Sequence, residues 1–234
     1  MINLNYKVLV NTILSTGTIQ DCRNGSQLII PNYSFELDFS TGIESAKLKL
    51  RKMYYKGVYG EFLTLIDPKP LTNVVKFEAN GCNYWKSWAD KDGSINIDYA
   101  NQMYPQLDDL ISNIKSDPTS RRLMIDLWVP ENVKSGKLSL PCCWHNMTFS
   151  VINGTLHMKW TQRSVDTMVG LPSDIYLAYL FMDYIANACE LSVGTCMFSL
   201  SNVHIYEEHI AAAEELLSRT EYDYDEPLKF KLKE

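Results

Sequence analysis

The sequence lacks the features of membrane-spanning, secreted and nucleic-acid-binding proteins. No apolar run approaches the roughly 20 residues of a membrane span, and the opening stretch MINLNYKVLVNTIL has no basic region before a continuous apolar segment. Lys and Arg number 22 against 28 Asp and Glu, so the net charge of −6 gives no general attraction for nucleic acid or an anionic membrane. We therefore expect a cytoplasmic protein that binds any anionic ligand with locally clustered arginines.

The sequence also has no paired CxxC spacing, no internal repeat and no Gly-, Pro- or Ser-rich tract that would form a linker. Its six cysteines fit reduced thiols better than a disulfide framework, and we predict no metal site. Because 46% of the 234 residues are apolar, residues 1–234 are expected to form a single domain around one core.

Apolar periodicity predicts a mixture of helices and strands, and hence the α+β class. A helix with Val8, Leu9 and Ile13 on one face should end at Gly17, and Glu61 should lie in a helix over residues 48–66. The other expected helices cover 104–114, 175–189 after a Ser173 cap, and 207–218. The expected strands cover 27–39 in two pieces broken at Pro31, 121–129, 147–152, 155–160 after an Asn153-Gly154 hairpin turn, 195–203, and a tail over 228–232.

One ordered set of motifs is specific. The run Gln162-Arg163-Ser164-Val165-Asp166 is followed by Gly170-Leu171-Pro172, and Cys143 lies twenty positions before the arginine (163 − 143 = 20). Around it lie SDPTSRR at 116–122, WADKDG at 88–93, ELSVGT at 190–195 and His204-Ile205-Tyr206. In this order, and over roughly Asp21 to Leu232, the sequence resembles the thymidylate synthase family and, within its fold, the phage deoxycytidylate (dCMP) hydroxymethylases.

This resemblance implies a fold and a set of partners. The family fold is α+β, with helices packed on a large mixed sheet and a homodimer formed through that sheet. The implied ligands are a pyrimidine nucleotide, dCMP or dUMP, and 5,10-methylenetetrahydrofolate as co-substrate. No metal and no nucleic acid take part.

The resemblance assigns the nucleophile to Cys143. A thiolate that adds to C6 of a pyrimidine turns the ring into an enamine, which makes C5 reactive toward a one-carbon unit. Two cysteines follow Pro141 where the family has one, and both the spacing to Arg163 and that to Gly154 (154 − 143 = 11) favour Cys143. Cys142 is then a packing residue, although the reverse assignment stays open. Arg163 would favour the thiolate by its charge, and Trp144 replaces the histidine of most synthases.

Further matches place residues around the nucleotide. Arg121 and Arg122 match a pair that reaches across the dimer to the partner's substrate phosphate, and such guanidinium groups suit a phosphate dianion. Arg23 lies one residue from another phosphate arginine of the family, whose place Cys22 takes here. The remaining matches are His204 and Tyr206 at the sugar 3′-hydroxyl, Ser164, Tyr99, and Asp166, which is equally open to a structural role.

Asp174 departs from the synthase pattern. Synthases have asparagine eleven residues after the motif arginine, where this chain has aspartate (163 + 11 = 174). An ionised carboxylate only accepts hydrogen bonds, so it suits the N4 amino group of cytosine and repels O4 of uracil. The hydroxymethylases have aspartate at this place. The alternative is that Asp174 caps the following helix.

The product is assigned by the end of the chain. Only 28 residues follow Tyr206 (234 − 206), so we expect a less closed site in which water, not hydride, completes the reaction and gives hydroxymethyl. Glu61 matches the family's catalytic glutamate, and Trp85 and Trp88 match aromatic residues at the folate ring.

Other functions stay open at this stage. A dCMP methyltransferase or a divergent thymidylate synthase acting on dUMP is the nearest alternative. A non-catalytic nucleotide-binding relative is favoured by Trp144 and the doubled cysteine. A cysteine hydrolase using Cys143 and His204 lacks any recognisable orienting group.

Overall fold

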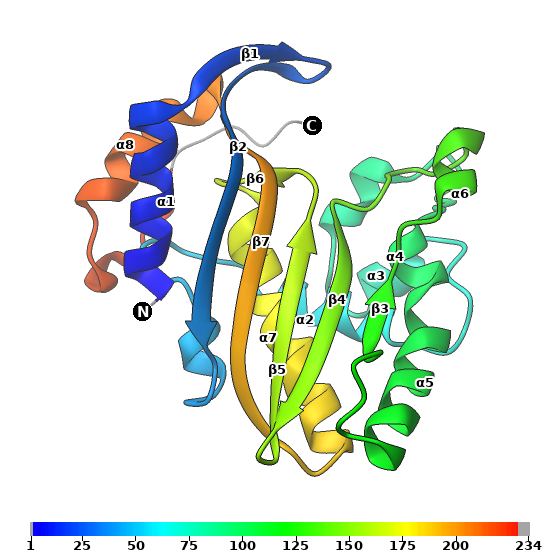
Figure 1. Ribbon diagram of the computed structural model, residues 1–234. Coiled ribbons are helices and arrows are strands. Elements are labelled where there is room, and N and C mark those ends of the chain that lie inside the picture. Colours follow the sequence, from blue (N-terminus) through cyan, green and yellow to red (C-terminus); the bar gives the residue numbers. More distant parts are fainter. Residues whose placement is uncertain (1, 229–234) are drawn as a thin grey trace.

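One seven-stranded mixed sheet runs through the computed structural model, which describes residues 2–228 (Figure 1). The strands lie in the order β1, β2, β7, β5, β4, β3, and β6 pairs with β7 beside this path. β5 and β6 run parallel to β7, and the other neighbours are antiparallel. The strands are β1 (Thr18–Cys22), β2 (Gly25–Asp38), β3 (Met124–Asp126), β4 (Trp144–Ile152), β5 (Thr155–Gln162), β6 (Val165–Asp166) and β7 (Ser192–Tyr206).

Helices flank this sheet, which confirms the predicted α+β class. In Figure 1, α2 and α7 lie behind the sheet, α1 and α8 beside β2, and α3 to α6 beside β3. The α-helices are α1 (Ile2–Thr16), α2 (Tyr55–Leu65), α3 (Val75–Ala79), α4 (Asp98–Asn101), α5 (Met103–Ser116), α6 (Pro130–Ser135), α7 (Gly170–Ala188) and α8 (Ile210–Ser218). Short 3-10 helices are η1 (Ile43–Ala46), η2 (Tyr84–Trp88), η3 (Glu207–His209) and η4 (Glu221–Asp223). Over residues 2–228, none of the helices has the length and apolarity needed to cross a bilayer.

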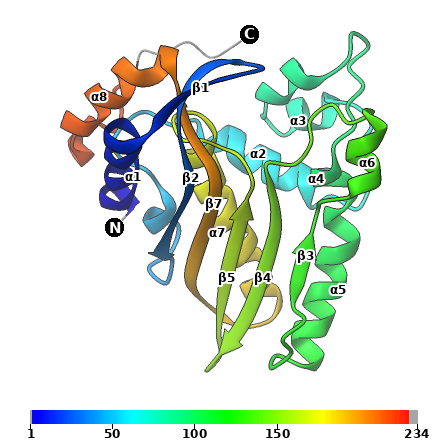
Figure 2. The same cartoon turned by 45° about the horizontal axis from the view of Figure 1, so that its top comes forward.

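The helix α7 forms the centre of the core. Twelve of its 19 residues are buried, as its nearly continuous apolar sequence requires. Phe181 contacts Phe62 of α2 and Trp144 of β4, with ring centroids 5.2 and 5.9 Å away. Because α7 lies between α2 and the sheet, its first turn, the middle of α2 and the start of β4 meet at one end of the molecule. Figure 2 brings forward this end, where the β1–β2 turn projects.

The hairpin predicted at Asn153-Gly154 is confirmed. It joins β4 to β5, and both residues have positive φ angles, 51° and 75°. An Asn-Gly pair adopts this conformation at little cost, which matches the twist of the two strands. The hairpin sets the register of β5, and therefore the position of the Gln162-Arg163 pair at its end.

The two strands expected within residues 27–39 form one continuous strand, so the predicted break at Pro31 is wrong. The register of β2 against β7 passes from Ile30–Val203 to Asn32–Ser201 across the proline. Asn202, the residue of β7 at this point, has a φ of 49°. The irregularity in β7 thus accommodates the missing N–H of the proline without ending β2.

Three helix predictions need correction. Val8 is 47% exposed, and α1 instead buries Tyr6, Leu9, Val10 and Ile13. The helix containing Glu61 begins at Tyr55, because Leu48 and Leu50 are buried in an extended segment with a two-residue period. The long apolar helix begins at Gly170, so Ser173 lies inside it and makes no cap. Of the strand expected over 228–232, only Leu228 falls within the described residues.

The front face of the sheet in Figure 1 carries no helix among the described elements. One row across it consists of Glu36, Met197, Lys159 and Thr148, which are paired in register on four adjacent strands and are all exposed. The neighbouring row contains Ser34, Ser199 and Thr161. This is a broad, mostly polar surface on which serine and threonine alternate with the longer side chains of Glu36, Met197 and Lys159.

Candidate active site

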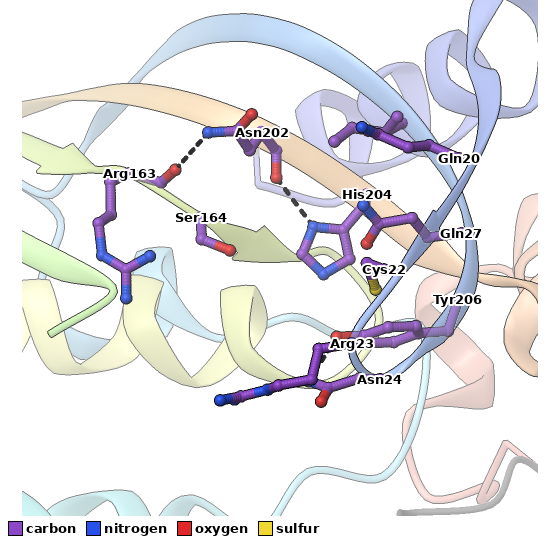
Figure 3. A pocket seen from close by; sticks show the side chains of 11 residues that line it. Gln20, Cys22, Arg23, Asn24, Gln27, Arg163, Ser164, Asn202, His204 and Tyr206 are labelled. Atoms are coloured by element: carbon purple, nitrogen blue, oxygen red, sulfur yellow. Dashed lines mark hydrogen bonds between the residues drawn. The ribbon is translucent and has the colours of Figure 1, made fainter. Parts of the chain in front are cut away.

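A cavity of about 340 Å³ lies where the β1–β2 turn, the β5–β6 connection and the end of β7 meet (Figure 3). Arg23, Arg163 and Ser164 line it together with His204 and Tyr206, so five of the residues predicted to contact the nucleotide lie around one space. The other lining residues are Gln20, Cys22, Asn24, Gln27, Ile29 and Asn202. Two arginines beside hydroxyl and amide groups fit a phosphorylated sugar.

Arg163 connects this cavity to the cysteine turn. Its guanidinium donates to the carbonyl oxygens of Cys142 (2.8 Å) and Pro141 (3.1 Å), and its backbone N–H donates to the Cys143 carbonyl (2.9 Å). The guanidinium carbon also lies 5.2 Å from the centroid of the Trp128 ring. The arginine is therefore held in place before any ligand binds, with its charge beside Cys143.

The two adjacent cysteines differ in environment. Cys142 is 2% exposed, and its thiol points to the Leu127 carbonyl, 3.9 Å away. Cys143 is half-buried. Burial raises the pKa of the Cys143 thiol, whereas the Arg163 charge lowers it and the Asp174 charge raises it again. The Arg163 charge lowers the pKa of both thiols, but at Cys142 burial and the Asp98 charge raise it. Cys143 is thus the more accessible thiol of the pair, and Arg163 favours its ionisation.

A cluster of aromatic rings packs next to the cysteine turn. The Tyr99 hydroxyl accepts a hydrogen bond from the Cys143 backbone N–H at 2.5 Å. The Tyr99 ring packs on Trp144, which in turn packs on Trp160, with centroids 4.5 Å apart in both pairs. Trp144, the residue that replaces a histidine, is therefore a buried core residue.

Asp174 is held by a short relay of side chains. The Trp160 indole N–H donates to Oε1 of Gln162 (3.2 Å), and Nε2 of Gln162 donates to Oδ2 of Asp174 (2.7 Å). Gln162 is 2% exposed, so this relay is part of the core. Asp174 lies within the first turns of α7 and makes no cap, which excludes the alternative that it only caps the helix. One carboxylate oxygen is fixed, and Oδ1 has no partner among the described residues.

The charge state of Asp174 depends on its surroundings. Burial raises the pKa of this carboxyl to about 7, the Gln162 hydrogen bond opposes the rise, and the charges of Glu61 and Asp166 add to it. Asp174 is therefore ionised above neutral pH and protonated below it. The effect of the Glu61 charge on Asp174 also places the two carboxyls within electrostatic reach of each other.

Glu61 is a buried carboxyl with two donors. It is 7% exposed, and its oxygens accept hydrogen bonds from the Tyr84 hydroxyl and from the Trp85 indole N–H, the latter at 2.8 Å. Burial raises the pKa of Glu61, and both hydrogen bonds lower it. A buried carboxyl with a raised pKa and two fixed donors is suited to hold and release a proton.

His204 and Tyr206 lie on the cavity wall at the end of β7. Nδ1 of His204 lies 2.8 Å from the Asn202 carbonyl, which only accepts, so Nδ1 carries the proton. Nε2 is then an acceptor for a hydroxyl group. The Tyr206 hydroxyl accepts a hydrogen bond from Asn24 at 3.4 Å.

Other predicted residues lie outside the cavity. Arg121 and Arg122 are exposed before β3, at the opposite end of the strand order from β1, and do not line this chain's own cavity. Asp166 accepts hydrogen bonds from the backbone N–H groups of Met168 and Val169, which shapes the turn into α7. Trp88 is 41% exposed, whereas Trp85 is 5% exposed beneath Glu61.

Several residues of the site were missed by sequence reasoning. Gln162 orients Asp174, Tyr84 contacts Glu61, and Trp128 lies under Arg163. Gln162 had a usable signal, because it precedes the motif arginine and shares the inner face of β5 with Trp160. Tyr84 and Trp128 had none, because their contacts bridge segments that are distant in sequence.

A comparison with known families agrees with this geometry. The family model described as thymidylate synthase matches residues 4–233, which is nearly the whole chain. The match spans the cysteine turn, the Gln162-Arg163 motif and the His204-Tyr206 pair. The family transfers a one-carbon unit from methylenetetrahydrofolate to a pyrimidine nucleotide. This chain belongs to the thymidylate synthase family.

Proposed function

We propose that the protein hydroxymethylates C5 of dCMP, with methylenetetrahydrofolate as the one-carbon donor and residues 1–234 as a single catalytic domain. The observation that carries this proposal is the Asp174 carboxylate, oriented by Gln162 beside Cys143 at the place where synthases have an asparagine. Oδ1 of the carboxylate accepts the N4–H of cytosine. Uracil would place O4 against the same oxygen, and two acceptors repel each other.

The first step follows from Cys143 and Arg163. The sulfur of Cys143 bonds to C6 of the base, and the C5–C6 electron pair then attacks the incoming carbon from C5. Arg163 promotes the thiolate and, with Arg23, holds the phosphate on the same side of the base. After carbon transfer the C5 proton would pass to a base, and the bond between the transferred carbon and the folate nitrogen would break, which releases tetrahydrofolate and leaves an exocyclic methylene on C5. Hydroxide from water would add to this methylene, and the Cys143–C6 bond would break to return the thiolate. Glu61, close to Asp174, holds the water and accepts a proton.

The protein residues near Glu61 fit a folate ring. The rings of Tyr84 and Trp88 on η2 are 42% and 41% exposed, and exposed aromatic faces suit stacking of a flat heterocycle. When bound, methylenetetrahydrofolate supplies carbon at the oxidation level of formaldehyde. Trp85, which is buried, would act through Glu61 and not by direct stacking.

A homodimer completes the phosphate site in this proposal. The helix-free face of the sheet is broad and carries serine and threonine beside the exposed Met197, which suits packing against the same face of a second copy. Arg121 and Arg122 then serve the partner's cavity. Their exposure and their distance from this chain's own cavity in the strand order support that arrangement.

A second candidate is one-carbon transfer to dUMP, with methyl or hydroxymethyl as product. It is favoured by the raised pKa of Asp174, about 7, because a protonated carboxyl can donate to O4 and accept from N3–H as an asparagine does. This activity would grow as the pH falls.

A competition assay tests the proposal. The protein is incubated at pH 8 with equal dCMP and dUMP and with methylenetetrahydrofolate, and the nucleotides are analysed by mass spectrometry. We expect dCMP to gain one CH2O unit while dUMP stays unchanged. A gain of CH2 shows methylation, preferential conversion of dUMP refutes the base assignment, and binding without conversion identifies a non-catalytic relative.

A further inference from the structure

The Glu61 carboxyl is bonded by two neighbouring residues of η2. The Tyr84 hydroxyl donates to Oε2 and the Trp85 indole N–H donates to Oε1. Each oxygen of this 7%-exposed carboxyl therefore has a donor that belongs to the same short helix. Both bonds stabilise the ionised form.

The two donors differ in mobility and access. The Trp85 ring is 5% exposed and stacks on Phe77 with centroids 5.3 Å apart and planes inclined by 19°. It cannot move without opening the core. The Tyr84 ring is 42% exposed, so Tyr84 is the donor that a bound ligand or water can reach.

The packing of α2 fixes Tyr84 over Glu61. Gly60 of α2 approaches the Asn80 carbonyl so closely that a Cβ at position 60 would lie 2.2 Å from the oxygen. The Asn80 side chain donates to Thr64 (2.9 Å), and the Tyr54 hydroxyl donates to the Gly81 carbonyl (3.0 Å). The segment that leads into η2 is thus attached to the helix that carries Glu61, and the Tyr84 contact is a product of this packing.

We propose that Tyr84 is a positioning residue for one-carbon transfer: its hydroxyl holds Glu61 as an oriented carboxylate and sets the pH at which Glu61 takes up a proton. This inference rests on the proposed role of Glu61 in proton transfer. Tyr84 needs no contact with the nucleotide for this role, because it acts through Glu61.

The groups that face Glu61 determine how a change at Tyr84 acts. Burial raises the pKa of Glu61, and the Tyr84 bond is the larger of the two hydrogen-bond contributions that lower it. Cys82, from the segment before η2, stays neutral because burial raises the pKa of its thiol to about 12. Asp174, from α7, is a second buried carboxyl whose pKa is raised, to about 7, and its charge interacts with that of Glu61. Removing the Tyr84 hydroxyl should therefore raise the pKa of Glu61, and Asp174 must be controlled for.

The titration of Glu61 tests this directly. The protein is labelled with 13C at the glutamate side-chain carboxyl, and the Glu61 resonance is assigned by its loss in Glu61→Gln. Tyr84→Phe should move the Glu61 titration upward by about one pH unit, the size expected for one charge-assisted hydrogen bond. The same shift is expected when Asp174→Asn is present in both proteins, which removes the titration of Asp174.

Tyr59→Phe is the matched control. Tyr59 lies on α2 with a 47%-exposed ring, and its variant also removes one phenol. It should leave the Glu61 titration unchanged. An unchanged titration in Tyr84→Phe, or an equal shift in Tyr59→Phe, overturns the inference.

The pH dependence of turnover separates this inference from the proposed function. If the ionised Glu61 is the active form, the acid limb of kcat moves upward by the same amount in Tyr84→Phe, while KM for folate changes little because the phenyl ring remains. A shifted titration with an unmoved acid limb refutes the positioning role. Absence of turnover by the unaltered protein refutes the proposed function, and the 13C titration then still decides whether Tyr84 controls Glu61.

Discussion

Replacing Asp174 with asparagine tests the base assignment, because the relay dictates how the new amide would lie. The Trp160 indole only donates, so its bond to Oε1 of Gln162 leaves Nε2 of Gln162 as the donor toward position 174. An amide there presents its oxygen to Gln162 and its NH2 to the base. That group pairs with O4 of uracil and opposes the N4 amino group of cytosine.

The expected change in preference is large. A well-matched pair of hydrogen bonds discriminates between bases by about 1–3 kcal/mol. Asp174→Asn loses this energy for dCMP and gains a similar amount for dUMP, so the ratio of kcat/KM values should change by about 30-fold or more. A side chain that does not contact the base would leave the ratio unchanged.

The same substitution has a predictable effect on stability. The carboxyl pKa rises from about 3.9 in the unfolded chain to about 7 in the folded protein. The ionised form is therefore disfavoured in the folded state, and stability is lost as the pH rises from about 4 to about 7. A pKa difference of about three units corresponds to a loss of about 4 kcal/mol in the free energy of unfolding, and this is an upper limit because the site can relax. Asp174→Asn should thus raise Tm at pH 8 relative to the unaltered protein, by more than it does at pH 4.

Two assays and one control variant test whether Asp174 selects the base. Steady-state kinetics with dCMP and dUMP give the preference, and thermal unfolding at pH 4 and pH 8 gives the stability change. Asp183→Asn removes another carboxylate of α7, one that accepts from the Tyr179 hydroxyl at 3.3 Å, and should change neither base preference nor its pH dependence. Retained dCMP preference in Asp174→Asn would refute the reasoning.

Three further predictions follow from the site. Cys143→Ser should abolish turnover, whereas Cys142→Ser should keep it at some cost in Tm; loss of turnover in Cys142→Ser alone would reverse the assignment of the nucleophile. Gln162→Met removes the hydrogen bond that lowers the pKa of Asp174, so the pH above which dCMP is preferred should rise. The ratio of kcat/KM for dCMP to that for dUMP, measured from pH 6 to 9, shows this, and an unchanged profile would mean that Gln162 does not act on Asp174. Mixing and refolding the Arg121→Ala/Arg122→Ala protein with the Cys143→Ala protein should recover about a quarter of the activity. Half the dimers then contain one chain of each kind, and in each of these one of the two sites has both its cysteine and the partner's arginines. No recovery would place the arginines outside the partner's site.

The sequence was sufficient for much of the fold because the informative patterns are local. Asn153-Gly154 determines its own turn, and the period of residues 104–114 depends only on neighbours within one helix. The errors arose where a distant segment decides the outcome. Pro31 is tolerated within β2 because Asn202 of β7 adopts a positive φ, and no feature near the proline indicates this.

The residues of the candidate site also fall into those that local sequence indicates and those that only distant contacts determine. The spacings of the resembled family favoured Cys143 over Cys142, and the structure adds a physical difference: the Cys143 thiol is half-buried beside Arg163, whereas the Cys142 thiol is buried against the Leu127 carbonyl. The orientation of Asp174 by Gln162 and of Glu61 by Tyr84 depends on the packing of α7 on the sheet and of η2 on α2. Such contacts arise only when the elements meet, so the sequence indicated the candidate reacting residues but not the residues that position them.

Covalent trapping with 5-fluoro-dCMP tests the central claim most directly. Because fluorine cannot leave C5 as a cation, the reaction should stop with Cys143 bonded to C6 and the transferred carbon bonded to C5. Intact-mass spectrometry should show one nucleotide with its attached methylenetetrahydrofolate per chain in the unaltered protein and in Cys142→Ser but not in Cys143→Ser, and no adduct when the folate is left out. An adduct that forms faster with 5-fluoro-dUMP, or that survives in Cys143→Ser, would contradict the account.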